Sequence, residues 1–104
     1  MAGITQEVKA AIREACKANF GNDAAKWESI VEGIVIQESG NFTDFIGDSG
    51  AAHGAMQMHL SAVEDASKDA KGNIQYGAAA KAWKAMQYEG NQAETIHYGV
   101  RYLK

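Results

Sequence analysis

The sequence has very little of several features that would place it in a specialised class of protein. It contains one cysteine, Cys16, and no proline among its 104 residues. A single cysteine cannot form an internal disulfide or a cysteine-based zinc cluster, so a disulfide-stapled scaffold and a zinc finger are both excluded. No apolar run approaches the roughly 18 residues that a membrane-spanning helix needs, and we therefore expect no membrane insertion.

An excess of positive charge is also missing. The chain has 10 Lys and Arg against 13 Asp and Glu, which gives a formal net charge of −3. Domains that bind nucleic acids or anionic membranes normally present a basic face, so we expect neither partner. The first residues carry charges where a secretory signal needs an uninterrupted apolar core, at Glu7, Lys9, Arg13 and Glu14. No export signal is therefore visible.

The composition is that of one small helical domain. Hydrophobic residues make up 46% and charged residues 22% of the chain, which is typical of folded globular proteins. A chain of this length supplies a single core, so residues 1–104 are expected to form one domain. Abundant alanine and absent proline favour helices. The sequence therefore predicts a mainly α fold of about five helices with a glycine-rich loop.

Apolar residues at three- and four-residue spacing indicate where these helices run. We expect helices over residues 5–19, 24–38, about 62–70, about 74–90 and about 96–103. Thr5 and Asp23 are the expected N-caps of the first two helices, and Ser61 with Glu64 has the spacing of a capping box for the third. Four glycines between residues 39 and 55 predict a loop there.

Glu38 attracts attention because it continues the apolar stripe of the second helix. The preceding positions of that stripe are Trp27, Ile30, Val31 and Ile34. Burial and the negative end of the helix dipole both disfavour a charged carboxylate, so we expect Glu38 to hold its proton more tightly than a free glutamate. Such a group can act as a general acid. Periodicity alone leaves open a surface glutamate at a frayed helix end.

Two segments of the sequence resemble motifs of the soluble lytic transglycosylases and goose-type lysozymes. The first segment covers residues 34–66 and contains Glu38-Ser39, Gly47-Asp48-Ser49-Gly50 and Gly54-Ala55-Met56-Gln57-Met58. The second runs over residues 95–103, with Gly99-Val100-Arg101 followed by Tyr102-Leu103. The motifs stand in the order found in these families, and the resemblance spans residues 27–103. It implies a small lysozyme-like helical domain.

The resemblance implies an enzyme that degrades peptidoglycan by cleaving the β-1,4 bond between N-acetylmuramic acid and N-acetylglucosamine. Glu38 would be the catalytic acid and base, with no metal or cofactor. In a lytic transglycosylase the 6-hydroxyl of the muramic acid attacks the anomeric carbon, and no second carboxylate is needed. An inverting hydrolase needs a base that activates water, and Asp48 is the candidate for it. We expect a transglycosylase, with a goose-type-like muramidase as the alternative; Asp48 as a plain turn residue also stays open.

The resemblance further places five side chains along the sugar-binding cleft. They are Ser39, Ser49, Met56, Gln57 and Tyr98. The amide of Gln57 suits an N-acetyl group because it both donates and accepts hydrogen bonds. Core packing remains an alternative for Met56 and Tyr98, and a turn for Ser49. The three histidines, His53, His59 and His97, do not have a metal-binding spacing, so structural or exposed roles are expected for them.

The expected partner is the glycan strand of peptidoglycan, at the bacterial cell wall. The families continue beyond the Tyr-Leu motif into a region with an Ala-Tyr-Asn motif whose tyrosine lines the cleft. We expect this wall to be missing, or to be supplied by another chain or by sequence outside residues 1–104. Release by lysis or carriage in a phage virion would bring the protein to the wall without an export signal. A non-catalytic wall-binding or structural phage module, and a helical interaction domain with an accidental motif match, are the alternatives.

Overall fold

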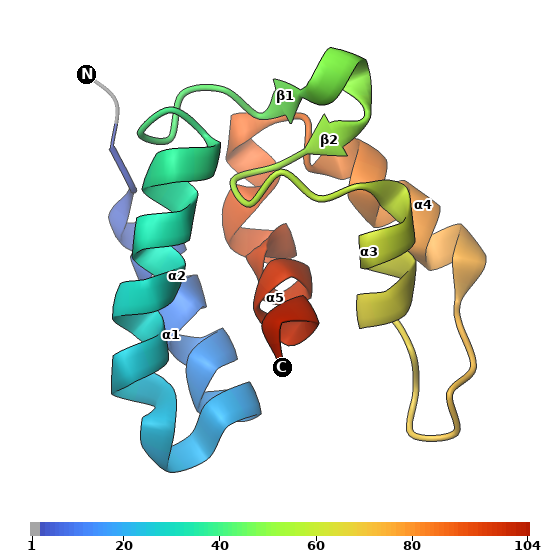
Figure 1. Cartoon of the computed structure of the whole chain (residues 1–104), viewed down its shortest axis with the longest axis horizontal. Helices are drawn as coiled ribbons and strands as arrows, with labels where there is room; N and C mark the ends of the chain where they lie inside the picture. The colour runs from blue at the N-terminus through green and yellow to red at the C-terminus, as the bar shows by residue number, and fades with distance from the viewer. Residues whose placement is uncertain (1–2) are drawn as a thin grey trace.

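The computed structural model describes residues 3–104 (Figure 1). It contains α1 (Gln6–Phe20), α2 (Ala24–Glu38), β1 (Ile46–Gly47), β2 (Ala52–His53), α3 (Leu60–Ala66), α4 (Tyr76–Ala85) and α5 (Gln92–Leu103). Single 3₁₀ turns lie at Gly21–Asp23, Asp48–Gly50 and Glu89–Asn91. The predicted mainly α class is confirmed. Four of the helices described have ten or more residues, whereas the expected third helix is a short one of seven.

The first two helices form an antiparallel hairpin. Thr5 caps α1 because its hydroxyl accepts a hydrogen bond of 3.2 Å from the amide of Val8. Gly21 ends α1 with a φ of 52°, a backbone conformation that glycine adopts without steric cost. Asp23 precedes α2 as expected but makes no side-chain hydrogen bond to the helix. The bounds of α2 are those predicted from the sequence.

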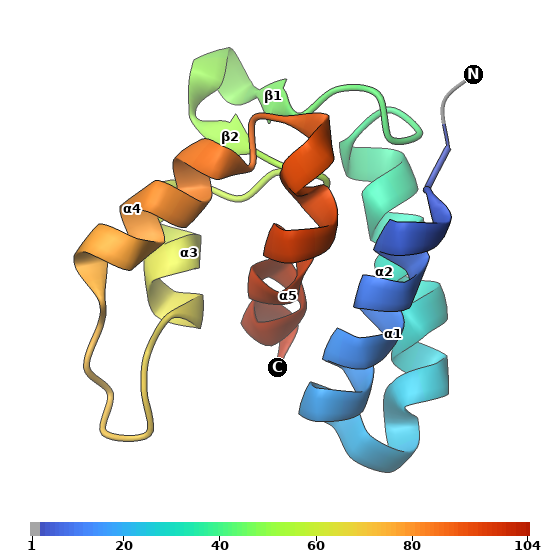
Figure 2. The ribbon, with the colours of Figure 1, turned by 180° about the vertical axis from the view of Figure 1, so that it is seen from behind.

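Helix α5 lies between this hairpin and the pair formed by α3 and α4, as both views show (Figures 1 and 2). The main core joins α1, α2 and α5 through buried apolar side chains that include Ile12, Val31, Val35 and Val100. A smaller cluster under α3 and α4 contains Met58, Val63, Ala79 and Met86. Partly buried Met56 packs against both clusters, so it connects the two parts of the core.

The short strands form a two-stranded antiparallel hairpin above the ends of α2 and α5 (Figure 1). Ile46 pairs with His53 and Gly47 with Ala52, and an isolated bridge joins His53 to Met58. Trp83 on α4 donates a hydrogen bond of 3.0 Å from Nε1 to the carbonyl of Met58. The glycine-rich segment predicted as a loop therefore has a fixed shape.

The predicted buried face of α2 is partly wrong, and the predicted start of α3 is wrong. In α2, Val31 is buried and Trp27 packs against the core as expected, whereas Ile30 is 38% exposed and Val35 is buried outside the predicted stripe. Helix α3 begins at Leu60 with His59 at its N-cap, so Ser61 lies inside the helix and forms no capping box with Glu64. No helix within residues 3–104 is long and apolar enough to cross a membrane.

Candidate functional site

Glu38 is the last residue of α2, and its side chain is exposed. It lies about 20° around the helix from Val31, seven residues earlier, which is fully buried. The burial predicted for Glu38 is nevertheless wrong, because the next turn of the buried face after Val35 is occupied by Ser39. The chain then folds back over Ser39 and leaves the carboxylate of Glu38 at the open end of the helix, where solvent reaches it.

Ser39 is 0% exposed and holds the turn that follows α2. Its hydroxyl donates to the carbonyl of Val35 and accepts a hydrogen bond of 2.9 Å from the amide of Phe42. The carbonyl of Ser39 also accepts hydrogen bonds of 2.9 Å from the amide of Thr43 and 2.8 Å from the amide of Asp44. A sugar cannot reach the Ser39 side chain without opening this turn. The predicted substrate contact is therefore corrected to a positioning role next to Glu38.

The segment after Glu38 concentrates the backbone strain of the molecule. Among residues 3–104, the non-glycine residues with positive φ are Asn41 (62°), Phe42 (64°), Asp48 (51°), Ser49 (56°) and Gln57 (50°). They all fall within the 17 residues from 41 to 57. Side chains with a Cβ rarely adopt this conformation, and such residues persist only where their surroundings enforce them. Strained residues are enriched at binding and catalytic sites. The strain therefore marks this segment as the candidate functional site.

Asp48 and His59 form an exposed side-chain contact at the edge of the β1–β2 hairpin. His59 Nε2 lies 3.0 Å from Asp48 Oδ2, and the two side chains are 52% and 64% exposed, respectively. Asp48 begins the 3₁₀ turn after β1, and His59 is the N-cap residue of α3, so the pair joins this turn to the start of α3. Ser49 follows Asp48 and is exposed, which leaves its hydroxyl accessible.

Gln57 and Met56 lie on the same segment and are both partly buried. The Gln57 amide donates a hydrogen bond of 2.9 Å to the carbonyl of Gly54. Its Oε1 packs directly over Gly47, where an added Cβ would collide with it. Met56 packs in the same manner against Gly99 of α5. At both glycines an added Cβ would therefore force the Gln57 or Met56 side chain to shift.

Tyr98 packs against the same buried cluster as Met56. It borders a groove of about 340 Å³ between α4 and α5, together with Lys81, Glu94 and His97. Its ring packs against that of His97 with centroids 4.3 Å apart. A second groove, of about 440 Å³, borders Trp83 and Gly50. Glu38 lines neither groove.

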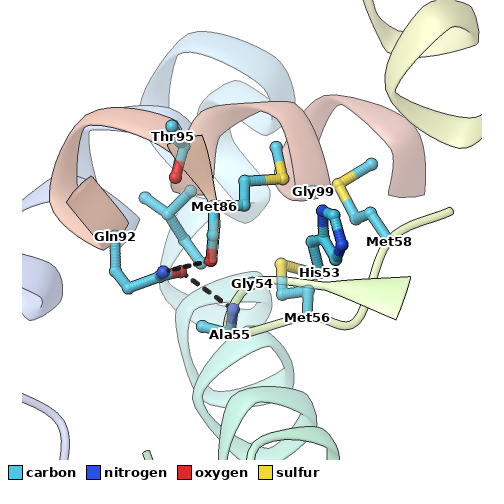
Figure 3. A pocket seen from close by; sticks show the side chains of 10 residues that line it. His53, Gly54, Ala55, Met56, Met58, Met86, Gln92, Thr95 and Gly99 are labelled. Atoms are coloured by element: carbon cyan, nitrogen blue, oxygen red, sulfur yellow. Dashed lines mark hydrogen bonds between the residues drawn. The ribbon is translucent and has the colours of Figure 1, made fainter. Parts of the chain in front are cut away.

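Gln92 is a further residue of this region that the sequence did not indicate. Its side chain is 1% exposed, and its Oε1 accepts a hydrogen bond of 2.9 Å from the amide of Ala55 (Figure 3). Its amide group donates hydrogen bonds of 2.7 Å to the carbonyl of Met86 and 2.9 Å to that of Tyr88. Gln92 thus ties the Gly54–Met58 segment to the start of α5. A glutamine in the first turn of a helix gives no pattern that predicts burial.

Within residues 3–104, no three His, Cys, Asp or Glu side chains come close enough together to hold a metal ion. Comparisons with models of known protein families, with characterised proteins and with solved structures find no match. The relationship of the two motif segments to lytic transglycosylases and goose-type lysozymes therefore stays a prediction. Its structural support is the arrangement of the two segments described above.

Proposed function

We propose that this protein cleaves the glycan strands of peptidoglycan between N-acetylmuramic acid and N-acetylglucosamine, with Glu38 as the acid. The supporting observation is the contact between Met56 and Gly99. An added Cβ at position 99 would lie 3.1 Å from Cε and 3.3 Å from Cβ of Met56, and it would collide with the sulfur. Met56 belongs to the first motif segment and Gly99 to the second. The two motif segments therefore touch each other in the folded chain, which supports treating them together.

In the proposed reaction, Glu38 gives its proton to the glycosidic oxygen as the bond to the anomeric carbon breaks. The carboxylate then takes the proton of the muramic acid 6-hydroxyl while that oxygen bonds to the anomeric carbon. The products are a 1,6-anhydro end and a free 4-hydroxyl, and Glu38 returns to its protonated form. One carboxylate is sufficient for this cycle. Its exposed position at the end of α2 lets a polymeric substrate reach it, but it also removes the burial from which the sequence predicted the acid role, so this role is supported by the motif resemblance alone.

The neighbouring residues have distinct parts in this proposal. Ser39 holds the turn that fixes the direction of Glu38, through its buried hydrogen bonds to Val35 and Phe42. The exposed hydroxyl of Ser49 and the amide of Gln57 are the polar groups that the sugar would meet. Met56 mainly packs the segment against α5.

Hydrolysis is the second candidate, and the pair formed by Asp48 and His59 favours it. With Nε2–H donated to the carboxylate, the Nδ1 atom of a neutral His59 is left with a lone pair. An imidazole held in this way by a carboxylate can take a proton from water. Water attack would give a reducing end in place of the anhydro end.

The test is digestion of purified peptidoglycan, followed by mass spectrometry of the released fragments. The parent chain should release fragments, and Glu38→Gln should release none while retaining the parent's circular dichroism. Glu32→Gln on the same helix is the matched control and should behave as the parent. Anhydro ends would support the transglycosylase and reducing ends the hydrolase. Cleavage that survives Glu38→Gln would overturn the proposal, and binding without any cleavage would indicate a wall-binding module.

A further inference from the structure

His53 on β2 is a buried histidine whose two ring nitrogens both face carbonyl oxygens. Its side chain is enclosed between the 3₁₀ turn after β1 and helix α4, and the residue is only 2% exposed. Nδ1 lies 2.8 Å from the carbonyl oxygen of Trp83, and Nε2 lies 2.9 Å from that of Gly50. The imidazole also stacks on the Trp83 ring, with centroids 3.9 Å apart and an interplanar angle of 17°.

This arrangement depends on the number of protons that the ring carries. A neutral imidazole has one N–H group and can donate to only one of the two carbonyls, whereas an imidazolium donates to both. The side chain of Gln87 provides the alternative, because its Nε2 lies 3.4 Å from the same Nε2 atom of His53. An amide N–H can donate to that nitrogen only when the nitrogen carries no proton. Gly50 and Gln87 therefore compete for one nitrogen of His53.

The titratable side chains that line the groove next to His53 are Lys81, Lys84 and Tyr88, which lie on α4 and just after it. No carboxylate is among the residues that line this groove. On the side of the β1–β2 hairpin, the charged residue of the 3₁₀ turn is Asp48, and its carboxylate contacts His59.

We propose that His53 acts as a pH-dependent clamp. The clamp is a hydrogen-bonded link between the β1–β2 hairpin and α4 that forms when the imidazole is protonated. When the ring is charged, it donates to Trp83 and Gly50 and fastens the turn at Asp48–Gly50 to the helix. When the ring loses the proton on Nε2, Gln87 donates to that nitrogen, and the carbonyl of Gly50 is released. The clamp thus closes as the pH falls and opens as it rises. It acts on the turn that carries Asp48, but it does not depend on glycan cleavage being the function.

Nuclear magnetic resonance of the folded chain tests this proposal directly, over a range from about pH 4 to about pH 9. The signals to follow are the His53 ring, the backbone amide of Ala51, which adjoins the Gly50 carbonyl, and the side-chain amide of Gln87. All three should move with the same pH midpoint. In Gln87→Leu the neutral ring loses its donor, so the midpoint should shift upward. Gln75→Leu, at an exposed position before α4, is the matched control and should leave the midpoint unchanged.

His53→Phe retains an aromatic ring against Trp83 but removes both nitrogens, and the pH-dependent shift of the Ala51 amide should disappear in it. If this variant does not fold, Gln87→Leu still decides the question. A ring that keeps one protonation state throughout, or Ala51 and Gln87 signals that do not follow the ring, would overturn the clamp. An unchanged or lowered midpoint in Gln87→Leu would also overturn it, since Gln87 would then not donate to the neutral ring.

Discussion

Replacing Gly99 by alanine measures how tightly the two motif segments are joined. Gly99 is buried in the interior of α5 and faces Met56. Alanine in place of glycine inside a helix normally gains roughly 1 kcal/mol of stability. Adding a methyl group to a filled space costs about 1–3 kcal/mol. An added Cβ would lie 3.3 Å from Cβ of Met56 and collide with its sulfur, so we expect the cost to dominate. The free energy of unfolding should fall by up to about 2 kcal/mol.

Gly33→Ala is the matched control, since an added Cβ in this exposed part of α2 meets no atom within 4 Å. It should raise the free energy of unfolding by roughly 1 kcal/mol. Both variants are compared with the parent by urea unfolding and linear extrapolation. The double variant Gly99→Ala/Met56→Ala should show a favourable coupling, because the shorter side chain removes the collision. If Gly99→Ala stabilises the chain as much as Gly33→Ala, Met56 moves aside freely and the contact does not join the motifs.

Three further predictions concern single side chains. Ser39→Ala leaves the buried amide of Phe42 without its hydrogen-bond acceptor, so it should lower the free energy of unfolding by about 1–3 kcal/mol in the same urea assay. The control Ser49→Ala, at an exposed position, should change the free energy of unfolding by less than about 0.5 kcal/mol. Burial, and secondarily the Glu28 carboxylate, raise the pKa of the Cys16 thiol. A thiol reagent at neutral pH should therefore modify Cys16 only after the chain unfolds. Rapid reaction of the native chain with the reagent would contradict this prediction. Asp48→Asn weakens the exposed contact between Asp48 and His59, and it should lower the free energy of unfolding, measured by thermal unfolding, by no more than about 1 kcal/mol. A larger loss would mean that this contact itself holds the β1–β2 hairpin.

The ends of α1 were predictable because local chemistry fixes them. Thr5 accepts a hydrogen bond from the first turn of α1, and Gly21 ends that helix in a left-handed conformation. Both effects act within a few residues, so the sequence contains them. The start of α3 was not predictable in this way, because His59 at its N-cap makes no side-chain hydrogen bond to the helix.

The buried face of α2 could not be predicted for a different reason. Ile34, Val35 and Ile36 are three consecutive apolar residues, so the spacing permits more than one stripe. The chain buries Val35 and leaves Ile36 48% exposed, because α1 and α5 lie on the side of Val35. The next turn on that side is Ser39, and Glu38 is exposed as a consequence. The position of Glu38 therefore depends on contacts with distant segments, which periodicity does not contain.

The segment after Glu38 differs from an ordinary surface loop in how its shape is maintained. Its strained residues persist because buried polar groups hold it at several points, and these include Gln92 at Ala55 and His53 at Trp83. Burying a polar group costs free energy unless its hydrogen-bond partners are well placed. Apolar side chains would fill the same space without this desolvation cost. Stability alone therefore does not account for these anchors. They fix the conformation of the segment that follows Glu38, and a fixed conformation is what a binding or catalytic surface requires.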